Sequence, residues 1–415
     1  MKIGIIGLGY VGLPLAVSFA EAGCDVVGFD ANPGRVDRLR RSESDIEDVP
    51  SDRLRAVAER FTATGEHRGL RSCEAVLICV PTPLANQREP DLSYIIDAAT
   101  NLSGHLERGQ LIVLESTTYP GTTRERLLPI LEESGLSAGT DFNLAFSPER
   151  IDPGRATDQL RTTPKVVGGL TPACFERARE VYGLICDEVV EVSSPEAAEL
   201  TKLLENIFRS VNIALVNELA QLCDRMGIDV WEVVEAASTK PFGFMRFDPG
   251  PGMGGHCLPV DPFYLAFKAR EHDFYPEFIE LAGKLNQSQP KFCVERAVRA
   301  LNEVEKSIKG SRILVLGVAY KAGVADMRES PALKIIRELR ELGGDVVYHD
   351  PHVAELGEFG LRSADLESEL ATADLVIIVT AHGSIDYQQV VRESDLVLDL
   401  RGVTRGIEAP NLVQL

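Results

Sequence analysis

The segment Gly7-Leu8-Gly9-Tyr10-Val11-Gly12 constrains the fold of this chain more than any other stretch. A short apolar run from Lys2 to Ile6 precedes it, and a helical pattern from Pro14 to Ala22 follows it. A second apolar run, from Asp25 to Phe29, leads directly to Asp30. This order is the dinucleotide-binding pattern: a strand, a GxGxxG turn, a helix and a second strand that leads to an acidic residue. Its first glycine permits the tight turn, the second lets the backbone approach the pyrophosphate, and the third lets the helix pack closely on the strand. The alternative is a glycine-rich turn in a sheet that binds no nucleotide, which the matching context disfavours.

Asp30 also indicates which dinucleotide binds. Its carboxylate can accept hydrogen bonds from the adenosine ribose and would repel a 2′-phosphate, which favours NAD over NADP. Nearby Arg35 weakens that preference, because an arginine can accommodate the phosphate. Loops rich in hydroxyl groups follow two further predicted strands, 75–80 and 111–115, and their threonines either contact a ligand or only form turns. The predicted NAD-binding residues of this part of the chain are Gly7, Gly9, Tyr10, Val11, Gly12, Asp30, Arg35, Thr82 and Thr117.

The chain is long enough for three domains. Residues 1–192 alternate strand and helix signals, which predicts a parallel, doubly wound sheet that binds NAD. Residues 193–305 read as helical. There, one long helix capped by Ser193 or Ser194 runs to about Met226, a second begins near Asp229 and a third spans roughly 276–308. A long helix between two sheet domains often provides a subunit interface, so we predict a homodimer formed through it.

Residues 306–415 repeat the pattern at the start of the chain. The runs 312–317, 344–350 and 373–380 parallel the first strands and their following turns, but the full glycine fingerprint is missing. The predicted fold is therefore α/β, with two Rossmann-like doubly wound parallel sheets joined by a central helical domain. The second sheet is expected to bind a different ligand from the first.

Composition and charge exclude several classes of protein. The net charge of -20 argues against nucleic-acid binding, which depends on neutralising phosphates. The eight cysteines are scattered without a CxxC pair, which is typical of reduced thiols in a cytoplasmic enzyme, and no Cys/His cluster predicts a metal site. The uncharged stretch 3–20 could pass for a signal peptide or membrane span, but its glycines and Pro14 favour a strand that turns into a helix.

A set of polar side chains lies in otherwise apolar or glycine-rich surroundings. Glu149 ends an apolar run, Lys202 and Asn206 lie one helical turn apart, and Cys257 follows a glycine run four residues before Asp261. Taken singly, a lysine on a helix is usually a solvated charge, and a cysteine is usually a small buried hydrophobe. Taken together, they supply a candidate nucleophile, a cation and two carboxylates.

These segments together resemble the nucleotide-sugar 6-dehydrogenase family, the UDP-glucose/GDP-mannose dehydrogenases. The resemblance spans residues 1 to about 401 and rests on the motifs Gly-Leu-Gly-Tyr-Val-Gly, Ser-Pro-Glu-Arg, Lys202 with Asn206, Gly-Gly-His-Cys with Asp261, and Arg-Glu-Ser-Pro at 328–331. It implies an NAD-binding domain (1–192), a central dimerisation and catalytic domain (193–305), and a C-terminal domain that binds the UDP-sugar (306–415).

The resemblance also implies the chemistry, which is the oxidation of a sugar primary alcohol to a carboxylate with two NAD. Cys257 would attack the intermediate aldehyde, and the thiohemiacetal would be oxidised to a thioester that water hydrolyses. Lys202 and Asn206 would stabilise the developing oxyanion, Asp261 would position water or relay protons, Glu149 would assist hydrolysis and Thr117 would lie near the reacting centre. Arg328 matches a position near the cofactor. The residues implied for substrate binding are Glu149, Arg150, Lys202, Asn206, Arg246, Gly254, Lys321 and Arg401.

The loop around Cys257 indicates the substrate branch. UDP-glucose enzymes typically carry Gly-Gly-Ser-Cys, whereas this chain reads Gly-Gly-His-Cys-Leu-Pro-Val-Asp, which is similar to the UDP-N-acetylhexosamine branch. The segment 147–154 favours UDP-N-acetylglucosamine, with the mannosamine epimer or UDP-glucose as alternatives. A two-electron β-hydroxyacid dehydrogenase or a non-catalytic nucleotide-sugar sensor remains as a reading from another class, although neither would need Cys257.

Overall fold

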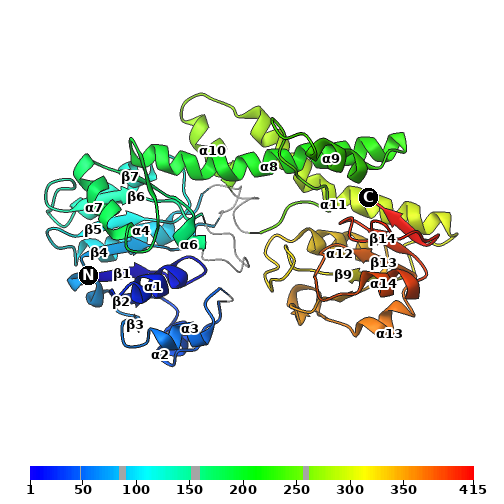
Figure 1. Ribbon diagram of the computed structural model, residues 1–415, viewed down its shortest axis with the longest axis horizontal. Helices are drawn as coiled ribbons and strands as arrows, with labels where there is room; N and C mark the ends of the chain where they lie inside the picture. Colours follow the sequence, from blue (N-terminus) through cyan, green and yellow to red (C-terminus); the bar gives the residue numbers. More distant parts are fainter. Residues whose placement is uncertain (47, 84–89, 151–158, 256–260) are drawn as a thin grey trace. The chain divides into compact units, whose positions relative to one another are not determined.

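The computed structural model describes residues 1–46, 48–83, 90–150, 159–255 and 261–415. They form two compact units, Met1–Glu205 with Phe263–Tyr275 and Asn206–Pro262 with Pro276–Leu415. The first sheet in the chain has eight strands and the second has five, and long helices connect them along the chain (Figure 1). The predicted α/β fold with two Rossmann-like sheets and a helical middle is confirmed.

The first sheet places the predicted cofactor strand near its centre. Its spatial order is β3 (Phe61–Thr64), β2 (Asp25–Phe29), β1 (Lys2–Ile6), β4 (Ala75–Ile78), β5 (Leu111–Leu114), β6 (Asn143–Phe146), β7 (Lys165–Gly169) and β8 (Val189–Val192). Strands β4 and β5 are buried at every position, as expected for a sheet covered by helices on both faces. Consecutive β1 and β2 pair in parallel, so Gly7 and Asp30 follow neighbouring strand ends.

One pairing in this sheet departs from the prediction, since β6 and β7 run antiparallel. Alternating strand and helix signals predict parallel strands, and they carry no information about a reversal of direction. The reversal brings Lys165, the first residue of β7, to the edge where β5 and β6 end, because Phe146 pairs with Gly168. Lys165 begins its strand, but the reversal places it at the carboxyl edge of the sheet, where ligands bind.

Helices and helical turns connect these strands. Helix α1 begins at Gly12, two residues earlier than predicted. The elements of this unit are α1 (Gly12–Glu21), α2 (Pro33–Arg40), α3 (Ser51–Ala56), η1 (His67–Ser72), α4 (Ser93–Ser103), η3 (Thr123–Leu127), α5 (Leu128–Glu132), α6 (Gln159–Thr162) and α7 (Pro172–Tyr182); α10 (Asp261–Arg270) contributes most of its length.

The sheet of the second unit repeats the central topology of the first. Its order is β10 (Asp345–His349), β9 (Arg312–Leu316), β13 (Leu375–Ile378), β14 (Val397–Asp399) and β15 (Leu412–Gln414), and all these pairings are parallel. The three runs that parallel the N-terminal strands in sequence all form strands of this sheet. The remaining elements are β11 (Glu355–Leu356), η4 (Gly357–Phe359), β12 (Leu361–Arg362), α12 (Pro331–Glu341), α13 (Leu366–Leu370) and α14 (Tyr387–Glu393).

The helical middle contains α8 (Pro195–Met226), α9 (Val230–Ser238) and α11 (Glu277–Glu303). Ser194 caps α8 by accepting a hydrogen bond from the Ala197 N–H at 3.2 Å, and Asp229 caps α9 through the Trp231 N–H at 2.8 Å. Both starts agree with the prediction, as does the end of α8. None of the described helices combines the length and apolarity that a membrane span requires.

Helix α11 ends earlier than the predicted position near 308. Glu305 adopts a left-handed φ of 59°, and the Lys306 N–H donates back to the Leu301 carbonyl at 2.9 Å. This is a Schellman ending, which usually has glycine at the left-handed position. The sequence has Glu there, so the pattern of apolar residues offered no stop signal.

Candidate active site

The glycine turn after β1 has the geometry that a dinucleotide requires. A Cβ at Gly7, whose φ is 92°, would lie 2.6 Å from the Cys79 carbonyl oxygen, and one at Gly12 would lie 1.8 Å from the Gly7 oxygen. A Cβ at Gly9 would meet nothing within 4 Å. The outer two glycines are therefore needed for packing, while Gly9 leaves room over the turn for a phosphate.

The start of α1 adds an attractive site for that phosphate. Its N-cap residue, Val11, makes no side-chain capping hydrogen bond, so the first amides of the helix are not capped by that side chain. Pro14 has no N–H and the Leu13 N–H already donates to the Gly9 carbonyl oxygen at 3.1 Å, so the positive end of the helix dipole is the main attraction for an anion. Half-buried Val11 and exposed Tyr10 lie in the same turn. The residues of this turn fit the pyrophosphate of NAD.

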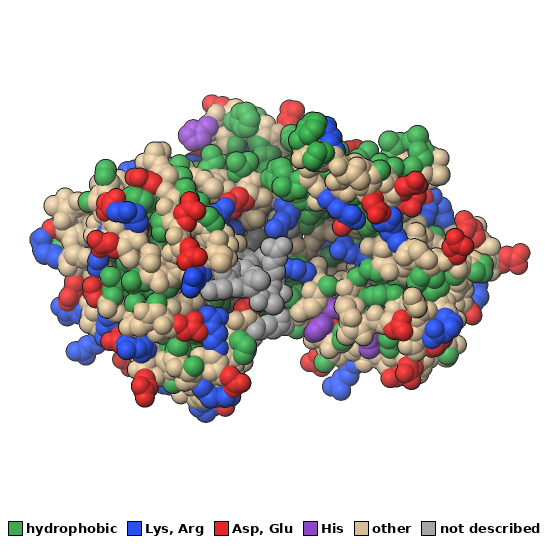
Figure 2. Space-filling view, in the orientation of Figure 1, with side chains coloured by type: hydrophobic (Ala, Val, Ile, Leu, Met, Phe, Trp, Pro, Cys, Tyr) green, Lys and Arg blue, Asp and Glu red, His purple; other side chains and the backbone are tan. Residues whose placement is uncertain are grey.

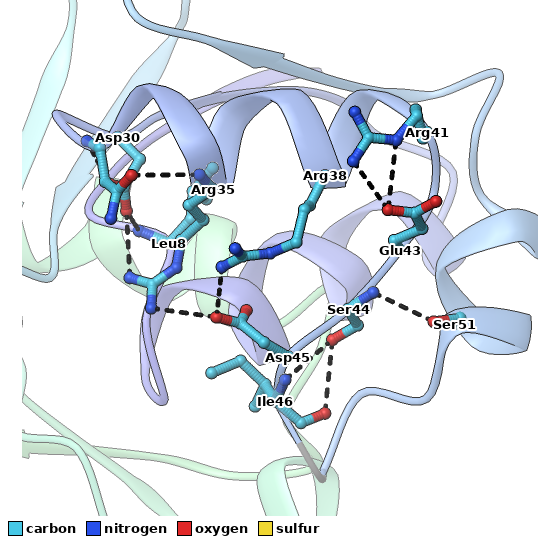
Figure 3. Close-up of polar contacts among 11 residues, drawn as sticks. Leu8, Asp30, Arg35, Arg38, Arg41, Glu43, Ser44, Asp45, Ile46 and Ser51 are labelled. Atoms are coloured by element: carbon cyan, nitrogen blue, oxygen red, sulfur yellow. Dashed lines mark hydrogen bonds and ion pairs between the residues drawn. The ribbon is translucent and has the colours of Figure 1, made fainter. Parts of the chain in front are cut away.

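Asp30 is held rigidly at the end of β2 (Figure 3). Its Oδ2 accepts a hydrogen bond from the Leu8 N–H at 3.0 Å, and its Oδ1 accepts one from the Asn32 N–H at 2.8 Å. The Nη1 of Arg35 lies 3.6 Å from the same Oδ2. The carboxylate that is expected to face the adenosine ribose is thus fixed to the glycine turn itself.

The two threonine loops beyond β4 and β5 are tied to each other. The Ser116 hydroxyl donates to the Val80 carbonyl oxygen at 2.8 Å, which joins the two loops. Tyr264 of α10 holds the first loop as well, because its hydroxyl donates to the Thr82 carbonyl oxygen at 2.8 Å. Thr82 is buried and Thr117 is half-buried. The structure places both predicted threonines at the carboxyl edge of the sheet, where ligands bind.

Glu199 of α8 fastens the second of these loops. Its carboxylate accepts hydrogen bonds from the Gly121 N–H at 2.6 Å, the Thr123 N–H at 2.8 Å and the Thr123 hydroxyl at 2.7 Å. Burial raises the pKa of the Glu199 carboxyl to about 7, and these hydrogen bonds oppose that rise. Glu199 precedes Lys202 by three residues, so the Thr117 loop is anchored within one turn of the predicted catalytic lysine.

Glu149, Arg150 and Lys202 come together although they are far apart in the sequence. The Lys202 ammonium donates to the Glu149 carbonyl oxygen at 2.5 Å, and the Arg150 guanidinium pairs with Glu205 of α8 at 2.7 Å. Lys202 is only 9% exposed, which contradicts the reading of a solvated surface charge. Asn206, one turn further along α8, is equally buried.

Sequence reasoning missed a buried charged cluster behind Glu149. Lys165 lies 2.7 Å from the Glu115 carboxylate and 3.6 Å from that of Glu149, and it donates to the Pro148 carbonyl oxygen at 3.2 Å. The Tyr182 hydroxyl donates to the other oxygen of Glu115. Burial alone would lower the pKa of Lys165, but the two carboxylates raise it above its ordinary value. The signal in the sequence was a charge at one terminus of each of two apolar strands, Glu115 directly after β5 and Lys165 at the start of β7.

In the second unit, the predicted glycine loop packs against the segment that carries Arg328. The Gly255 N–H donates to the Arg328 carbonyl oxygen at 3.0 Å, and a Cβ at Gly254 would lie 2.9 Å from the Glu329 carbonyl oxygen. The Arg328 guanidinium itself pairs with Asp326 at 2.6 Å. Glycine is therefore required here by close backbone packing within the protein.

The other predicted substrate residues of this unit are separately placed. Exposed Arg246 pairs with Asp248 at 2.8 Å, and half-buried Lys321 follows the turn after β9. A Cβ at Gly250 would lie 2.5 Å from a guanidinium nitrogen of Arg401, so Arg401 lies against that backbone. Arg401 and Arg246 thus both contact the segment that leads to the glycine loop.

The second sheet carries an equivalent of Asp30 that is not open to a ribose. Asp350 follows β10, and its carboxylate accepts backbone hydrogen bonds from Val318 at 2.7 Å and from Ala319, His352 and Val353. Nε2 of His382 lies 3.0 Å away, and both side chains are fully buried. Burial opposes ionisation, but these hydrogen bonds outweigh it and lower the pKa of Asp350 to about 2. The carboxylate is therefore already occupied by groups of the protein itself.

Cys257 and the side chain of Asp261 lie outside the described residues. The seven cysteines that the structure describes are all free and buried. Burial raises the pKa of Cys73 to about 11 and that of Cys186 to about 12, so these thiols stay protonated. A thiolate nucleophile needs a lowered pKa and access. Neither Cys73 nor Cys186 therefore has the lowered pKa and the accessibility of a nucleophilic thiol.

Comparison with known proteins agrees with this arrangement. Three models of the UDP-glucose/GDP-mannose dehydrogenase family match successive parts of the chain: the NAD-binding domain at residues 1–185, the central domain at 196–288 and the UDP-binding domain at 314–406. Asp350, whose carboxylate is occupied by the protein's own groups, lies in the region that matches the UDP-binding domain.

Individual relatives match over almost the full length. The UDP-N-acetyl-D-glucosamine 6-dehydrogenase of Pseudomonas aeruginosa is 37% identical over 92% of this chain and 90% of its own. The NDP-N-acetyl-D-galactosaminuronic acid dehydrogenase of Ralstonia solanacearum is 34% identical over 97% and 96%. The solved UDP-D-ManNAc dehydrogenase of Pyrococcus horikoshii superposes with a TM-score of 0.92 at 34% identity, covering 100% of this chain and 99% of that one. The chain therefore belongs to the UDP-glucose/GDP-mannose dehydrogenase family and is an NAD-dependent nucleotide-sugar 6-dehydrogenase.

Proposed function

We propose that this enzyme oxidises the C6 alcohol of a UDP-N-acetylhexosamine, UDP-N-acetylglucosamine in particular, to the uronate. The observation that carries the proposal is the buried ammonium of Lys202 against the backbone of Glu149, at the carboxyl edge of the cofactor sheet. A fixed cation in a site of low polarity stabilises oxygen that gains negative charge, as the alcohol and aldehyde oxygens do here.

NAD, when bound, accepts a hydride at each of the two oxidation steps. Gly9 and the uncapped start of α1 would hold its pyrophosphate, and Asp30 would hold its adenosine ribose. We assign Tyr10, Val11, Arg35, Thr82, Thr117 and Arg328 to the same cofactor site. The side chains of these residues orient the cofactor relative to the sugar, and they are not chemically altered in the reaction.

Cys257 has the covalent role in the second oxidation. Its thiolate attacks the C6 aldehyde, and the carbonyl oxygen becomes the hydroxyl of a thiohemiacetal on taking up a proton. Loss of that proton and of the C6 hydride forms a thioester, and water then releases the uronate and restores the thiol. We assign Lys202 and Asn206 to the oxyanion, Asp261 and Glu149 to water and proton transfer, and Thr117 to the reacting centre.

The substrate proposal rests on the sugar-specific loop and on the relatives. The Gly-Gly-His-Cys sequence is similar to that of the UDP-N-acetylhexosamine branch. One of the relatives, a UDP-N-acetyl-D-glucosamine 6-dehydrogenase, is 37% identical to this chain. Relatives acting on other N-acetylhexosamines match almost as well, which makes the mannosamine and galactosamine epimers and UDP-glucose the competing substrates. Arg150, Arg246, Gly254, Lys321 and Arg401 complete the proposed substrate site.

The stoichiometry of the reaction tests this proposal. We expect two NADH for each UDP-N-acetylglucosamine consumed, and a kcat/KM for this sugar above those for UDP-N-acetylmannosamine, UDP-N-acetylgalactosamine, UDP-glucose and GDP-mannose. NADH absorbance against product quantified by chromatography measures both quantities. One NADH per sugar would contradict the double oxidation, while two NADH with another sugar preferred would correct only the substrate.

We also propose that the enzyme acts in the cytoplasm as a homodimer formed through α8. Phe208, Leu215, Leu219, Leu222 and Met226 recur at helical spacing, and each is at least 41% exposed. Hydrophobic side chains gather over α8 and α9 in Figure 2. A stripe of this kind is typical of an interface, because monomers rarely expose contiguous apolar surface.

Disruption of the stripe tests the dimer. Leu219→Glu would place a charge in the interface, and we expect light scattering at micromolar concentration to change from the dimer mass to the monomer mass. Leu342→Glu is the matched control, since Leu342 is an exposed leucine of the same unit that lies at the end of α12 and not on α8. An unchanged mass for Leu219→Glu would exclude this face as the interface.

A further inference from the structure

The loop between α2 and α3 inserts a second carboxylate next to the ribose site. Oδ2 of Asp45 lies 3.4 Å from Nη2 of Arg35 and 2.7 Å from Nη2 of Arg38 (Figure 3). A single carboxylate oxygen therefore bridges two guanidinium groups. Arg35 at the same time approaches Asp30 at 3.6 Å, so it lies between two acidic side chains.

Two arginines that converge on one oxygen can bind a phosphate as well as a carboxylate. In dinucleotide-binding sheets, an arginine beyond the second strand is the group that accommodates the 2′-phosphate of NADP. Here the two arginines face a carboxylate of the chain itself. Their Nε atoms are buried and have no hydrogen-bond partner among the described residues, so Asp45 does not satisfy all of their donors.

The chain holds Asp45 in this position through its neighbours. The Ser44 N–H donates to the Ser51 hydroxyl at 3.0 Å, which ties the loop to the first residue of α3. The Ser44 hydroxyl in turn accepts a hydrogen bond from the Ile46 N–H at 3.1 Å. Asp45 and Arg38 are still 36% and 41% exposed, and exposed ion pairs contribute little to stability. A contribution to stability is therefore a weak explanation for this cluster.

We propose that Asp45 is a second selectivity residue of the cofactor site, which occupies Arg35 and Arg38 and so denies them to the 2′-phosphate of NADP. Asp30 rejects the phosphate by direct repulsion from a fixed position. Asp45 removes the attraction that the two arginines would otherwise supply. Selectivity for NAD in this chain thus has two separable components, one repulsive and one that cancels attraction.

Equilibrium binding separates the two components without requiring turnover. Calorimetric Kd values for NAD and NADP would be measured for wild type, Asp45→Asn, Asp30→Ser and the double variant. We expect Asp45→Asn to tighten NADP relative to NAD about tenfold in the Asp30→Ser background, the size of one charge-assisted hydrogen bond, and less in the wild-type background. The gain should shrink as ionic strength rises, because it comes from arginine–phosphate attraction.

Two further variants keep the proposal falsifiable. Asp37→Asn removes a carboxylate from α2 that pairs with Arg40 at 3.7 Å, and we expect it to leave the NADP to NAD ratio of Kd values unchanged. Asp45→Glu retains the charge and should keep the wild-type ratio. The proposal is overturned if Asp45→Asn changes the ratio less than twofold in the Asp30→Ser background, if Asp37→Asn changes it equally, or if Asp45→Asn weakens both dinucleotides alike.

Discussion

Replacement of Cys257 by serine is expected to lower the steady-state rate of NADH formation by about 10³-fold or more, equivalent to about 4 kcal/mol of transition-state stabilisation. The physical reason is that an aldehyde carbon cannot lose a hydride easily until a nucleophile has added to it. A serine hydroxyl has too high a pKa to supply an anion at neutral pH, whereas a cysteine can. We expect at most one NADH per enzyme chain, formed in the first oxidation. Stopped-flow absorbance followed by a steady-state assay measures both phases.

A cysteine that the structure describes provides the matched control. Cys73→Ala removes a buried thiol whose pKa burial raises to about 11, and it should leave the stoichiometry of two NADH per sugar unchanged. If Cys257→Ser still formed two NADH per sugar at a similar rate, the second hydride would come from the hydrated aldehyde. Water would then be the nucleophile, and the thioester route would be wrong.

The local architecture of this enzyme could be predicted from its sequence because its signals lie close together along the chain. The glycines of the first turn, the strand that ends at Asp30 and the apolar face of α8 each show within about thirty residues. The echo between the two halves likewise predicted the second sheet. The structure brings the Lys202 ammonium to the carbonyl oxygen of Glu149, and the family resemblance assigned both residues to one site.

The remaining features depend on contacts between distant segments. The reversal of β7 leaves no trace in the apolar pattern, so the meeting of Lys165 with Glu115 could not be predicted. Asp350 occupies the position equivalent to Asp30, and only the folded structure shows that backbone amides and His382 already satisfy it. Propensity identifies the elements, but it does not identify the partners of a buried charge.

The largest expected effect on stability follows from that cluster. Lys165→Met should destabilise the first unit by about 3–5 kcal/mol, because it leaves the fully buried carboxylate of Glu115 without its cation. Burial and the Glu115 charge raise the pKa of Tyr182 well above its ordinary value, so this phenol can donate a hydrogen bond but cannot replace the charge. Activity should fall as well, since Lys165 also contacts the carboxylate of Glu149 and the carbonyl of Pro148.

Calorimetric unfolding measures the loss, and the single tryptophan identifies the unit that is affected. Trp231 is buried in the second unit, so its fluorescence reports that unit, while circular dichroism reports both. We expect the Lys165→Met transition to move to lower temperature by calorimetry and circular dichroism, with a smaller change in the Trp231 signal.

A second substitution separates loss of charge balance from loss of packing. Lys165→Met combined with Glu115→Gln removes both charges and keeps an acceptor for the Tyr182 hydroxyl, and we expect it to recover more than half of the lost stability. Activity should recover less, because Glu149 still lacks its cation. A Lys165→Met variant within about 1 kcal/mol of wild type would mean that Glu115 binds a proton in the folded protein. Equal recovery of stability and activity in the double variant would show that Lys165 acts on the fold alone and has no part in positioning Glu149.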